Sequence, residues 1–228
     1  MSFIINPFRF SITACTGSVI NTTNLTAYYK FNDNANDTSS SGVNGTLFGN
    51  ASYVAGKFGN ALHTTGTTQQ GMSAATNTAF EGSGGTISAF GWVKVTDYTE
   101  AAPHAFNKWN GASGGWRIVP RAADILVTLG NTNITKGSGV ATGSWVHIGF
   151  TYDNTNVVIY QNGVSAGTIT AAAGKTLTST NNFFVGRASN TNASYFKGDI
   201  DDVSIWKRVL GKQEVLDLYN ATCPLSGA

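Results

Sequence analysis

Three aspartates, Asp199, Asp201 and Asp202, stand within four residues near the end of the chain. Carboxylates this close repel one another unless a cation or abundant water lies between them. They come directly before a β-rich apolar run that begins at Val203. The cluster therefore either lines a cation site or is the solvated start of a strand.

Glycoside hydrolysis needs a pair of carboxylates on either side of the scissile bond. The glutamates Glu81, Glu100 and Glu214 fall in three separate parts of the sequence, and no strand-like segment carries an alternating acidic array. No histidine stands beside a Ser or Cys in a nucleophile elbow such as Gly-x-Ser-x-Gly. We therefore expect a protein that is not an enzyme.

Proteins bind sugars through aromatic side chains with amide groups beside them. Trp109 lies between Asn107 and Asn110 in the least strand-like part of the sequence, and Tyr98 stands in a polar loop before it. We expect these four residues to bind a glycan. The alternative is that Trp109 packs beneath its own loop. The tryptophans expected in the core are Trp92, Trp116, Trp145 and Trp206.

The composition narrows the class of protein. Charged residues make up 11% of the 228 residues, against roughly 25% in an average soluble chain. The 27 glycines, with abundant Thr, Asn and Ser, favour strands and turns over helices. A formal net charge of +2 without any basic run argues against nucleic acid as a partner. No apolar run approaches the ~20 residues of a membrane span, so we expect no membrane insertion.

Short β-rich segments separated by turn signals predict an all-β sandwich or jelly roll. Asn162-Gly163 between two such segments is a strong hairpin signal, and the single helix expected lies at 209–219. A polar loop is expected at 32–45. The expected strands lie at 25–31, 57–63, 86–95, 116–119, 124–129, 145–152, 157–164, 182–186 and from 196 onward.

Several short motifs follow one another in a characteristic order between about Leu25 and Ala221. They are Ala27-Tyr-Tyr-Lys-Phe-Asn32, Gly56-Lys-Phe-Gly-Asn-Ala-Leu62, Ile87-Ser-Ala-Phe-Gly-Trp-Val93, Tyr160-Gln-Asn-Gly163 and Gly198-Asp-Ile-Asp-Asp-Val203. With these motifs the chain resembles the laminin-G-like, concanavalin A-like lectin/glucanase jelly-roll family. The resemblance implies a sandwich of two antiparallel sheets, with six or seven strands each, and a short C-terminal helix. It does not determine function, because this fold serves lectins, adhesion modules, hydrolases and virion proteins alike.

The resemblance also implies a metal site. In similar lectins and glucanases, the aspartate that begins the Asp-x-Val-x-Ile strand binds a structural calcium ion, and the matching residue here is Asp201. The loop that contains Asp37 should approach it and help to supply the six to eight oxygen ligands that calcium takes. The alternative is that Asp201 accepts hydrogen bonds from a loop backbone and binds no ion.

The two ends of the chain suggest a role in assembly. Residues 1–24 lack clear periodicity after Ile12, and we interpret them as an N-terminal arm or assembly segment before a jelly-roll domain at 25–228. Cys15 and Cys223 could meet in a disulfide that closes a long loop, or they are two unrelated thiols.

The composition suits an extracellular protein, yet the sequence begins at Met1 without a credible export signal. A phage virion resolves this conflict, because it is assembled in the host cytoplasm and acts outside. We therefore expect a virion structural protein, a capsid decoration or tail/fibre subunit, that contacts other virion subunits, forms a homo-oligomer and binds host-surface glycans. The alternative is a carbohydrate-binding or adhesion module of a secreted bacterial protein at the cell surface.

Overall fold

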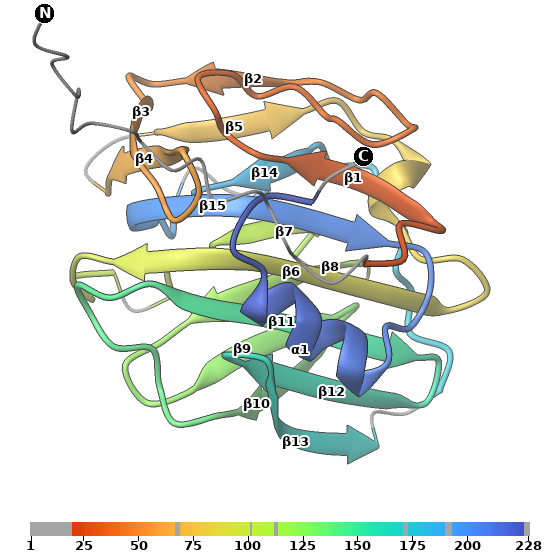
Figure 1. Cartoon of the computed structure of the whole chain (residues 1–228). Coiled ribbons are helices and arrows are strands. Elements are labelled where there is room, and N and C mark those ends of the chain that lie inside the picture. Colours follow the sequence, from red (N-terminus) through yellow and green to blue (C-terminus); the bar gives the residue numbers. More distant parts are fainter. Residues whose placement is uncertain are drawn as a thin grey trace, which may run out of the picture.

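The computed structural model describes residues 20–66, 69–100, 102–111, 114–170, 173–189 and 193–225. These residues form two packed antiparallel sheets, one 3₁₀ turn, η1 (Thr78–Phe80), and one α-helix, α1 (Lys212–Asn220) (Figure 1). The predicted sandwich of two antiparallel sheets with a short C-terminal helix is therefore confirmed. The sheets contain eight and seven strands, where six or seven each were expected.

The eight-stranded sheet runs in the order β13-β12-β11-β6-β15-β4-β3, and β1 also pairs with β15. The bounds of its strands are β1 (Leu25–Tyr29), β3 (Ser52–Ala55), β4 (Asn60–Thr65), β6 (Thr86–Val95), β11 (Val146–Asp153), β12 (Asn156–Gln161), β13 (Val164–Thr170) and β15 (Lys197–Trp206).

The seven-stranded sheet runs in the order β10-β9-β8-β7-β14-β5-β2. The bounds of its strands are β2 (Gly45–Phe48), β5 (Gly71–Ala74), β7 (Phe106–Trp109), β8 (Gly115–Pro120), β9 (Ile125–Leu129), β10 (Thr132–Lys136) and β14 (Phe183–Val185).

The main core lies between the sheets, because alternate residues of each strand point inward. In β6, Ile87 and Val93 join this core, whereas Phe90 belongs to a second apolar cluster on the outside of the sheet. The segment 86–95 expected as a strand is thus confirmed, with its side chains divided between two apolar clusters. The predicted hairpin is confirmed as well: Asn162 and Gly163 have φ angles of 50° and 76°, the left-handed conformation that a type I′ turn requires.

Strand β15 connects the beginning and the end of the domain. One of its edges pairs with β6, and the other pairs first with β4 and then with β1. The register with β6 shifts between Asp201 and Ser204, where Asp202 has a φ of 48°. A bulge of this kind bends the strand and redirects its side chains. The acidic cluster therefore lies where the last strand changes partner and meets the first.

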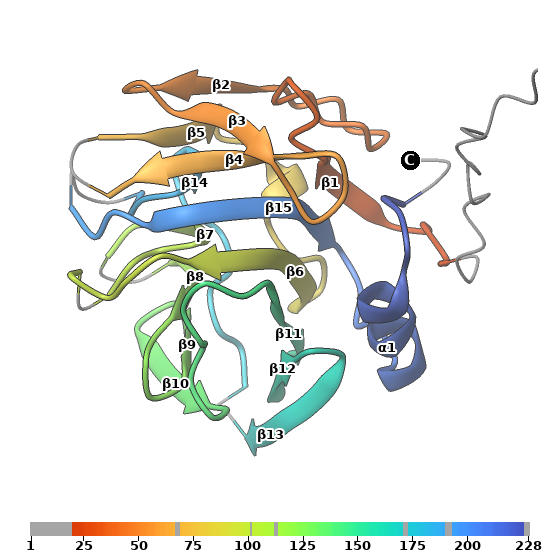
Figure 2. The same cartoon turned by 60° about the vertical axis from the view of Figure 1, so that its left-hand side comes forward.

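Helix α1 covers the outer face of the eight-stranded sheet (Figure 2). Tyr28, Phe90 and Trp206 on this face are buried with Val215 and Leu218 of the helix. We call this outer face the covered face. In the described part of the chain this is the only α-helix, so the outer face of the seven-stranded sheet has no helix over it.

The strands missed by the sequence analysis are only four or five residues long: β2, β3, β5, β7 and β10. β10 has the sequence Thr-Asn-Ile-Thr-Lys and lies at the edge of its sheet, where only Ile134 is buried. Residues 1–19, with Cys15 and most of the expected arm, lie outside the described residues. The described part of the chain has no helix with the length and apolarity that a membrane span requires.

Candidate functional site

Asp201 binds a loop backbone. Its Oδ2 accepts hydrogen bonds from the backbone N–H groups of Lys57 and Phe58, at 2.8 and 3.0 Å, and its Oδ1 accepts one from Asp202 at 2.8 Å. The side chain is fully buried, and burial raises the pKa of this carboxyl to about 7. The turn between β3 and β4 is therefore fastened to β15 through Asp201.

Asp37 organises its own loop. Oδ1 accepts from the backbone N–H groups of Tyr28 and Ser39, both at 2.9 Å, and Oδ2 accepts from that of Val43 at 2.9 Å. The structure joins Asp201 to the 56–59 turn rather than to the 32–45 loop that was expected to reach it. The described residues contain no group of three or more His, Cys, Asp or Glu that could hold a metal ion. Calcium at Asp201 stays a prediction. The hydrogen bonds of Asp201 to Lys57 and Phe58 are those expected if the side chain holds a loop backbone instead.

The other two aspartates of the cluster point to different partners. Asp199 contacts Nδ1 of His63 at 2.7 Å and Nζ of Lys94 at 3.6 Å. Asp202 accepts a hydrogen bond from the Tyr28 hydroxyl, and burial beside Asp201 raises the pKa of Asp202 well above its ordinary value. The cluster is therefore a set of separate structural contacts.

Two of the four residues expected to bind a glycan are committed to the fold. Asn107 is fully buried; its Nδ2 donates to the carbonyl of Arg187 at 2.6 Å, and its Oδ1 accepts from the N–H of Ser189 at 2.8 Å. Tyr98 donates its hydroxyl to the carbonyl of Val140 at 2.5 Å and packs against the main core. The polar groups of both side chains are thus engaged within the protein, and their role as ligand contacts stays a prediction.

Trp109 was expected in the least strand-like part of the sequence. In the structure it is the last residue of strand β7. Its indole is partly exposed, and its Nε1–H donates to the carbonyl of Gly130 at 2.7 Å. The neighbouring Asn110 closes the turn that follows, because its Oδ1 accepts from the N–H of Gly114 at 2.9 Å. Trp109 and Asn110 are thus the predicted ligand contacts that the structure leaves near the surface.

The guanidinium of Arg117 stacks on the Trp109 indole, with Cζ 3.8 Å from the ring centroid. Nε of Arg117 donates to Thr128 Oγ1 at 2.8 Å, and Nη1 lies 2.8 Å from Nε2 of His104. Because a guanidinium only donates, Nε2 must be the acceptor, so the neutral His104 ring carries its proton on Nδ1. Burial, with Arg117 nearby, lowers the pKa of His104 to about 3 and keeps it neutral.

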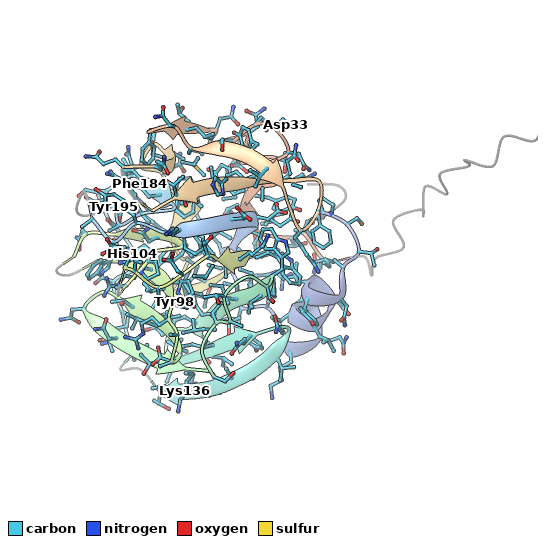
Figure 3. All side chains as sticks on the ribbon, turned by 90° about the vertical axis from the view of Figure 1, so that its left-hand side faces the viewer. Asp33, Tyr98, His104, Lys136, Phe184 and Tyr195 are labelled. Carbon is cyan, nitrogen blue, oxygen red and sulfur yellow. The ribbon has the colours of Figure 1, made fainter. Side chains whose placement is uncertain are left out.

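Arg117 and Thr128 belong to one row of side chains across the seven-stranded sheet. Register pairs Asn107 with Arg117, Arg117 with Thr128, and Thr128 with Asn133, from β7 to β10. Thr128 continues the hydrogen-bond chain by donating to Asn133 Oδ1 at 2.7 Å. We call this row, together with Trp109, the open face. In Figure 3, His104 lies on the same side of the molecule as Phe184 and Tyr195.

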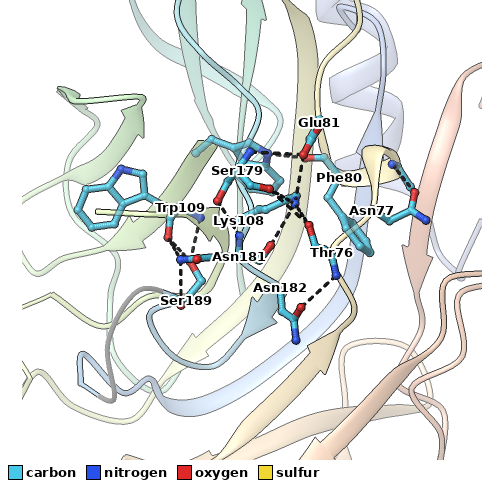
Figure 4. A network of polar contacts seen from close by, with 12 residues as sticks. Thr76, Asn77, Phe80, Glu81, Lys108, Trp109, Ser179, Asn181, Asn182 and Ser189 are labelled. Atoms are coloured by element: carbon cyan, nitrogen blue, oxygen red, sulfur yellow. Dashed lines mark hydrogen bonds and ion pairs between the residues drawn. The ribbon is translucent and has the colours of Figure 1, made fainter. Parts of the chain in front are cut away.

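A buried lysine holds the backbone beneath Trp109. Lys108 is fully buried, and its Nζ donates to Thr76 Oγ1 and to the carbonyl of Ser179, both at 2.6 Å, with Glu81 at 3.2 Å. Asn181, whose carbonyl accepts from Lys108 at 3.0 Å, donates its side-chain amide to the carbonyl of Trp109 (Figure 4). This network fixes the end of β7 and therefore the direction in which Trp109 points.

Two hollows lie near or beside this face. A pocket of about 390 Å³ beside Trp109 is lined by Asn110, Glu81 and threonines 176, 178 and 180. A wider depression of about 780 Å³ lies between β10 and the β12–β13 hairpin and includes Lys136 and Gln161. No aromatic residue lines either of these two hollows, whereas the open face presents the partly exposed Trp109 indole.

The sequence alone does not indicate Arg117, Thr128 or Asn133 as site residues. Arg117 stands between two core residues, Trp116 and Ile118, in a β-rich run, and such a charge is usually a solvated outward side chain. Cross-strand register brings Arg117, Thr128 and Asn133 together, and His104, which precedes β7, joins them through its contact with Arg117. The one signal available was strict alternation in β8, which places residue 117 on the face opposite to Trp116.

Comparisons with known structures agree with the fold. Domain 4 of AbnA, a GH43 extracellular arabinanase from Geobacillus stearothermophilus, solved in complex with arabinotriose, matches with a TM-score of 0.69 and 24% identity over 86% of this chain and 98% of that one. The binding domain of Paraclostridial Mosquitocidal Protein 1 matches with a TM-score of 0.71 and 16% identity over 87% of this chain.

The binding domain of botulinum neurotoxin serotype G matches with a TM-score of 0.70 and 17% identity over 86% of this chain. The chain spans 52% and 50% of the lengths of the mosquitocidal and botulinum toxin structures. A search of curated proteins finds no match.

A family model described as the concanavalin A-like lectin/glucanases superfamily matches residues 65–216. The matched segment contains most strands of both sheets, the whole open face and the first part of α1. The chain therefore belongs to the concanavalin A-like lectin/glucanase superfamily.

Proposed function

We propose that this chain is a glycan-binding module and that the open face around Trp109 is its binding surface. The observation that carries the proposal is the partly exposed Trp109 indole, stacked with Arg117 beside a row of polar side chains. An indole offers an apolar surface to the C–H groups of a sugar ring, and Arg117 and Asn133, the two members of the row that are not buried, offer hydrogen bonds to its hydroxyl groups. The arabinotriose bound to the similar arabinanase domain supports this choice of ligand class.

The module binds a glycan without cleaving it. The carboxylates that hydrolysis would need are engaged elsewhere: Glu81 pairs with Lys108, and Glu214 pairs with Arg208 at 2.6 Å. Of the described row, Asn107, Arg117, Thr128 and Asn133, none carries a carboxylate. The open face therefore lacks the paired acids that the chemistry of glycosidases requires.

A glycan array tests the proposal, with the wild type and Trp109→Ala on the same slides. We expect discrete hits for the wild type and their loss in Trp109→Ala, while Lys136→Ala, in the depression between β10 and β13, keeps them. Thermal melting of each variant shows whether it is folded. Hits that survive Trp109→Ala and disappear in Lys136→Ala would move the site to that depression and contradict the proposal.

For the biological setting we propose a virion, as a capsid decoration or tail/fibre subunit that forms a homo-oligomer, with a secreted adhesion module as the alternative. The low charged fraction of 11% supports a protein that works outside a cell. Light scattering coupled to size exclusion would measure the oligomeric state, and mass spectrometry of purified particles would detect the chain in a virion. Its presence only in the secreted fraction of a bacterial culture would favour the alternative.

A further inference from the structure

Arg117 is a partly buried cation without a carboxylate partner. In the part of the chain that the structure describes, five other cationic side chains each pair with an aspartate or glutamate: Lys94, Lys108, Arg121, Lys197 and Arg208. The contacts of Arg117 are instead neutral: Thr128, His104 and the Trp109 ring.

This arrangement keeps a charge on the open face that nothing in the described protein neutralises. Burial, with the charge of Arg121 nearby, lowers the pKa of Arg117 to about 10, which still leaves the guanidinium charged at neutral pH. A desolvated charge is unfavourable until an opposite charge joins it. An anion that reaches this position would therefore be favoured.

The guanidinium also has donors to spare. A guanidinium has five N–H bonds, and the two hydrogen bonds to Thr128 and His104 use one on Nε and one on Nη1. The remaining three are spread over Nη1 and Nη2. The Arg117 side chain is partly exposed, and no hydrogen bond from Nη2 to a described residue accompanies those of Nε and Nη1. Two parallel N–H bonds suit the two oxygens of one anionic group.

We propose that the glycan bound by the open face carries an oxyanion, a carboxylate or a sulfate ester on the sugar, and that Arg117 binds this group. The inference rests on the proposed function and names the class of glycan. The sugar ring would lie against the exposed part of Trp109 while its anionic group pairs with the free N–H bonds of Arg117.

The contacts around Arg117 prepare it for this role. Stacking on Trp109 fixes the plane of the guanidinium, and the hydrogen bonds to His104 and Thr128 fix its rotation within that plane. Little side-chain freedom then remains to be lost when a ligand binds, and preorganisation of this kind increases affinity. His104 and Thr128 are thus positioning residues for Arg117.

Titration calorimetry on matched ligands tests the inference. Sialyllactose is compared with lactose, trigalacturonate with its methyl ester, and sulfated lactose with lactose, so that the carboxylate and sulfate arms are separate. We expect at least one acidic sugar to bind the wild type about ten- to a hundredfold more tightly than its neutral partner, the range of a charge-assisted hydrogen-bonded pair. This preference should shrink as salt is added, because salt screens an exposed ion pair.

Three variants separate Arg117 from general charge. Arg117→Gln should abolish the preference for the acidic sugar, and Arg117→Lys, which keeps the charge but loses the planar fork, should keep part of it. Arg121→Gln removes the same charge from a neighbouring arginine that already pairs with Asp124 at 2.5 Å, and it should keep the full preference. Thermal melting confirms that each variant is folded.

Each possible outcome tests either the inference about Arg117 or the proposed function. Equal affinity of the wild type for every acidic sugar and its neutral partner would overturn the inference and leave the proposed function intact. A preference that survives Arg117→Gln, or that Arg121→Gln also abolishes, would overturn the role of Arg117. Absence of binding to every sugar would overturn the proposed function and the inference together.

Discussion

The two outer faces of the sandwich both carry aromatic side chains, but these are buried on one face and partly exposed on the other. On the covered face, Tyr28, Phe90 and Trp206 are buried beneath α1 and the segment that follows it. On the open face, Trp109 and Arg117 stack on each other and remain partly exposed. An aromatic residue beneath a helix contributes stability, whereas an exposed aromatic residue is available to a ligand.

The arginines of the two faces also differ in their partners. Arg208, beside the covered face, forms two contacts with Glu214 at 2.6 and 2.9 Å, and Glu214 also accepts from the N–H of Gly211 where α1 begins. Arg117 on the open face has only neutral partners. One arginine is satisfied by the fold, and the other has unused hydrogen-bonding capacity. The covered face therefore contributes stability, and the open face is the surface that we propose for recognition.

The largest expected effect comes from Trp206→Ala. The side chain is fully buried on the covered face, so its removal should lower the free energy of unfolding by about 3–5 kcal/mol. Trp109→Ala should cost only about 1–2 kcal/mol, because the indole is partly exposed and loses one hydrogen bond. Urea unfolding of both variants measures the difference. Equal losses would mean that the two faces do not differ in this way.

A smaller loss is expected from Asp201→Ala. It leaves the partly buried N–H groups of Lys57 and Phe58 without this acceptor, which should cost about 1–3 kcal/mol. If these hydrogen bonds are the whole role of Asp201, a calcium chelator leaves the melting temperature of the wild type unchanged. A lower melting temperature in chelator, with no further change in Asp201→Ala, would instead establish the calcium site.

The pH dependence of stability should reveal the buried acid Asp202. Its pKa is raised in the folded protein, so above the ordinary value of about 3.9 the folded state holds a proton that the unfolded state has lost, and stability falls as pH rises. Asp202→Asn does not titrate, so the variant should gain stability relative to the wild type between about pH 4.5 and pH 8. Urea unfolding at several pH values measures this gain.

Asp97→Asn is the matched control of opposite sign. Lys197 lowers the pKa of Asp97 to about 2, so the stability that Asp97 contributes is fully present above its ordinary pKa of about 3.9 and is lost only as pH falls through about 2. The difference between this variant and the wild type should therefore stay constant from pH 4.5 to pH 8. A constant difference for Asp202→Asn as well would contradict the account of the buried acid.

The smallest expected effect is that of Tyr98→Phe. The variant loses the hydrogen bond to the carbonyl of Val140, which should cost about 1 kcal/mol. Glycan binding should not change, because Tyr98 serves the core rather than the open face. Loss of the array hits would restore Tyr98 to the binding site, as the sequence suggested.

The long, strongly alternating strands could be predicted from the sequence, and the site only in part. β6 and β11 were found because each is long and buries one full side against the main core. β7 and β10 were missed because segments of four or five residues are too short for their alternation to differ from that of a loop until neighbouring strands pair with them. Trp109 was chosen for its residue type, whereas Arg117 became visible only through its register with Thr128.

The central claim is that the open face binds the ligand, and NMR spectroscopy of the indole N–H groups tests it most directly. The chain has five tryptophans, and single-tryptophan substitutions assign their signals. On titration with a sugar identified on the array, we expect the Trp109 signal to shift while those of Trp92 and Trp206, buried in the other sheet, stay in place. Shifts at Trp92 or Trp206 with an unchanged Trp109 signal would contradict the claim.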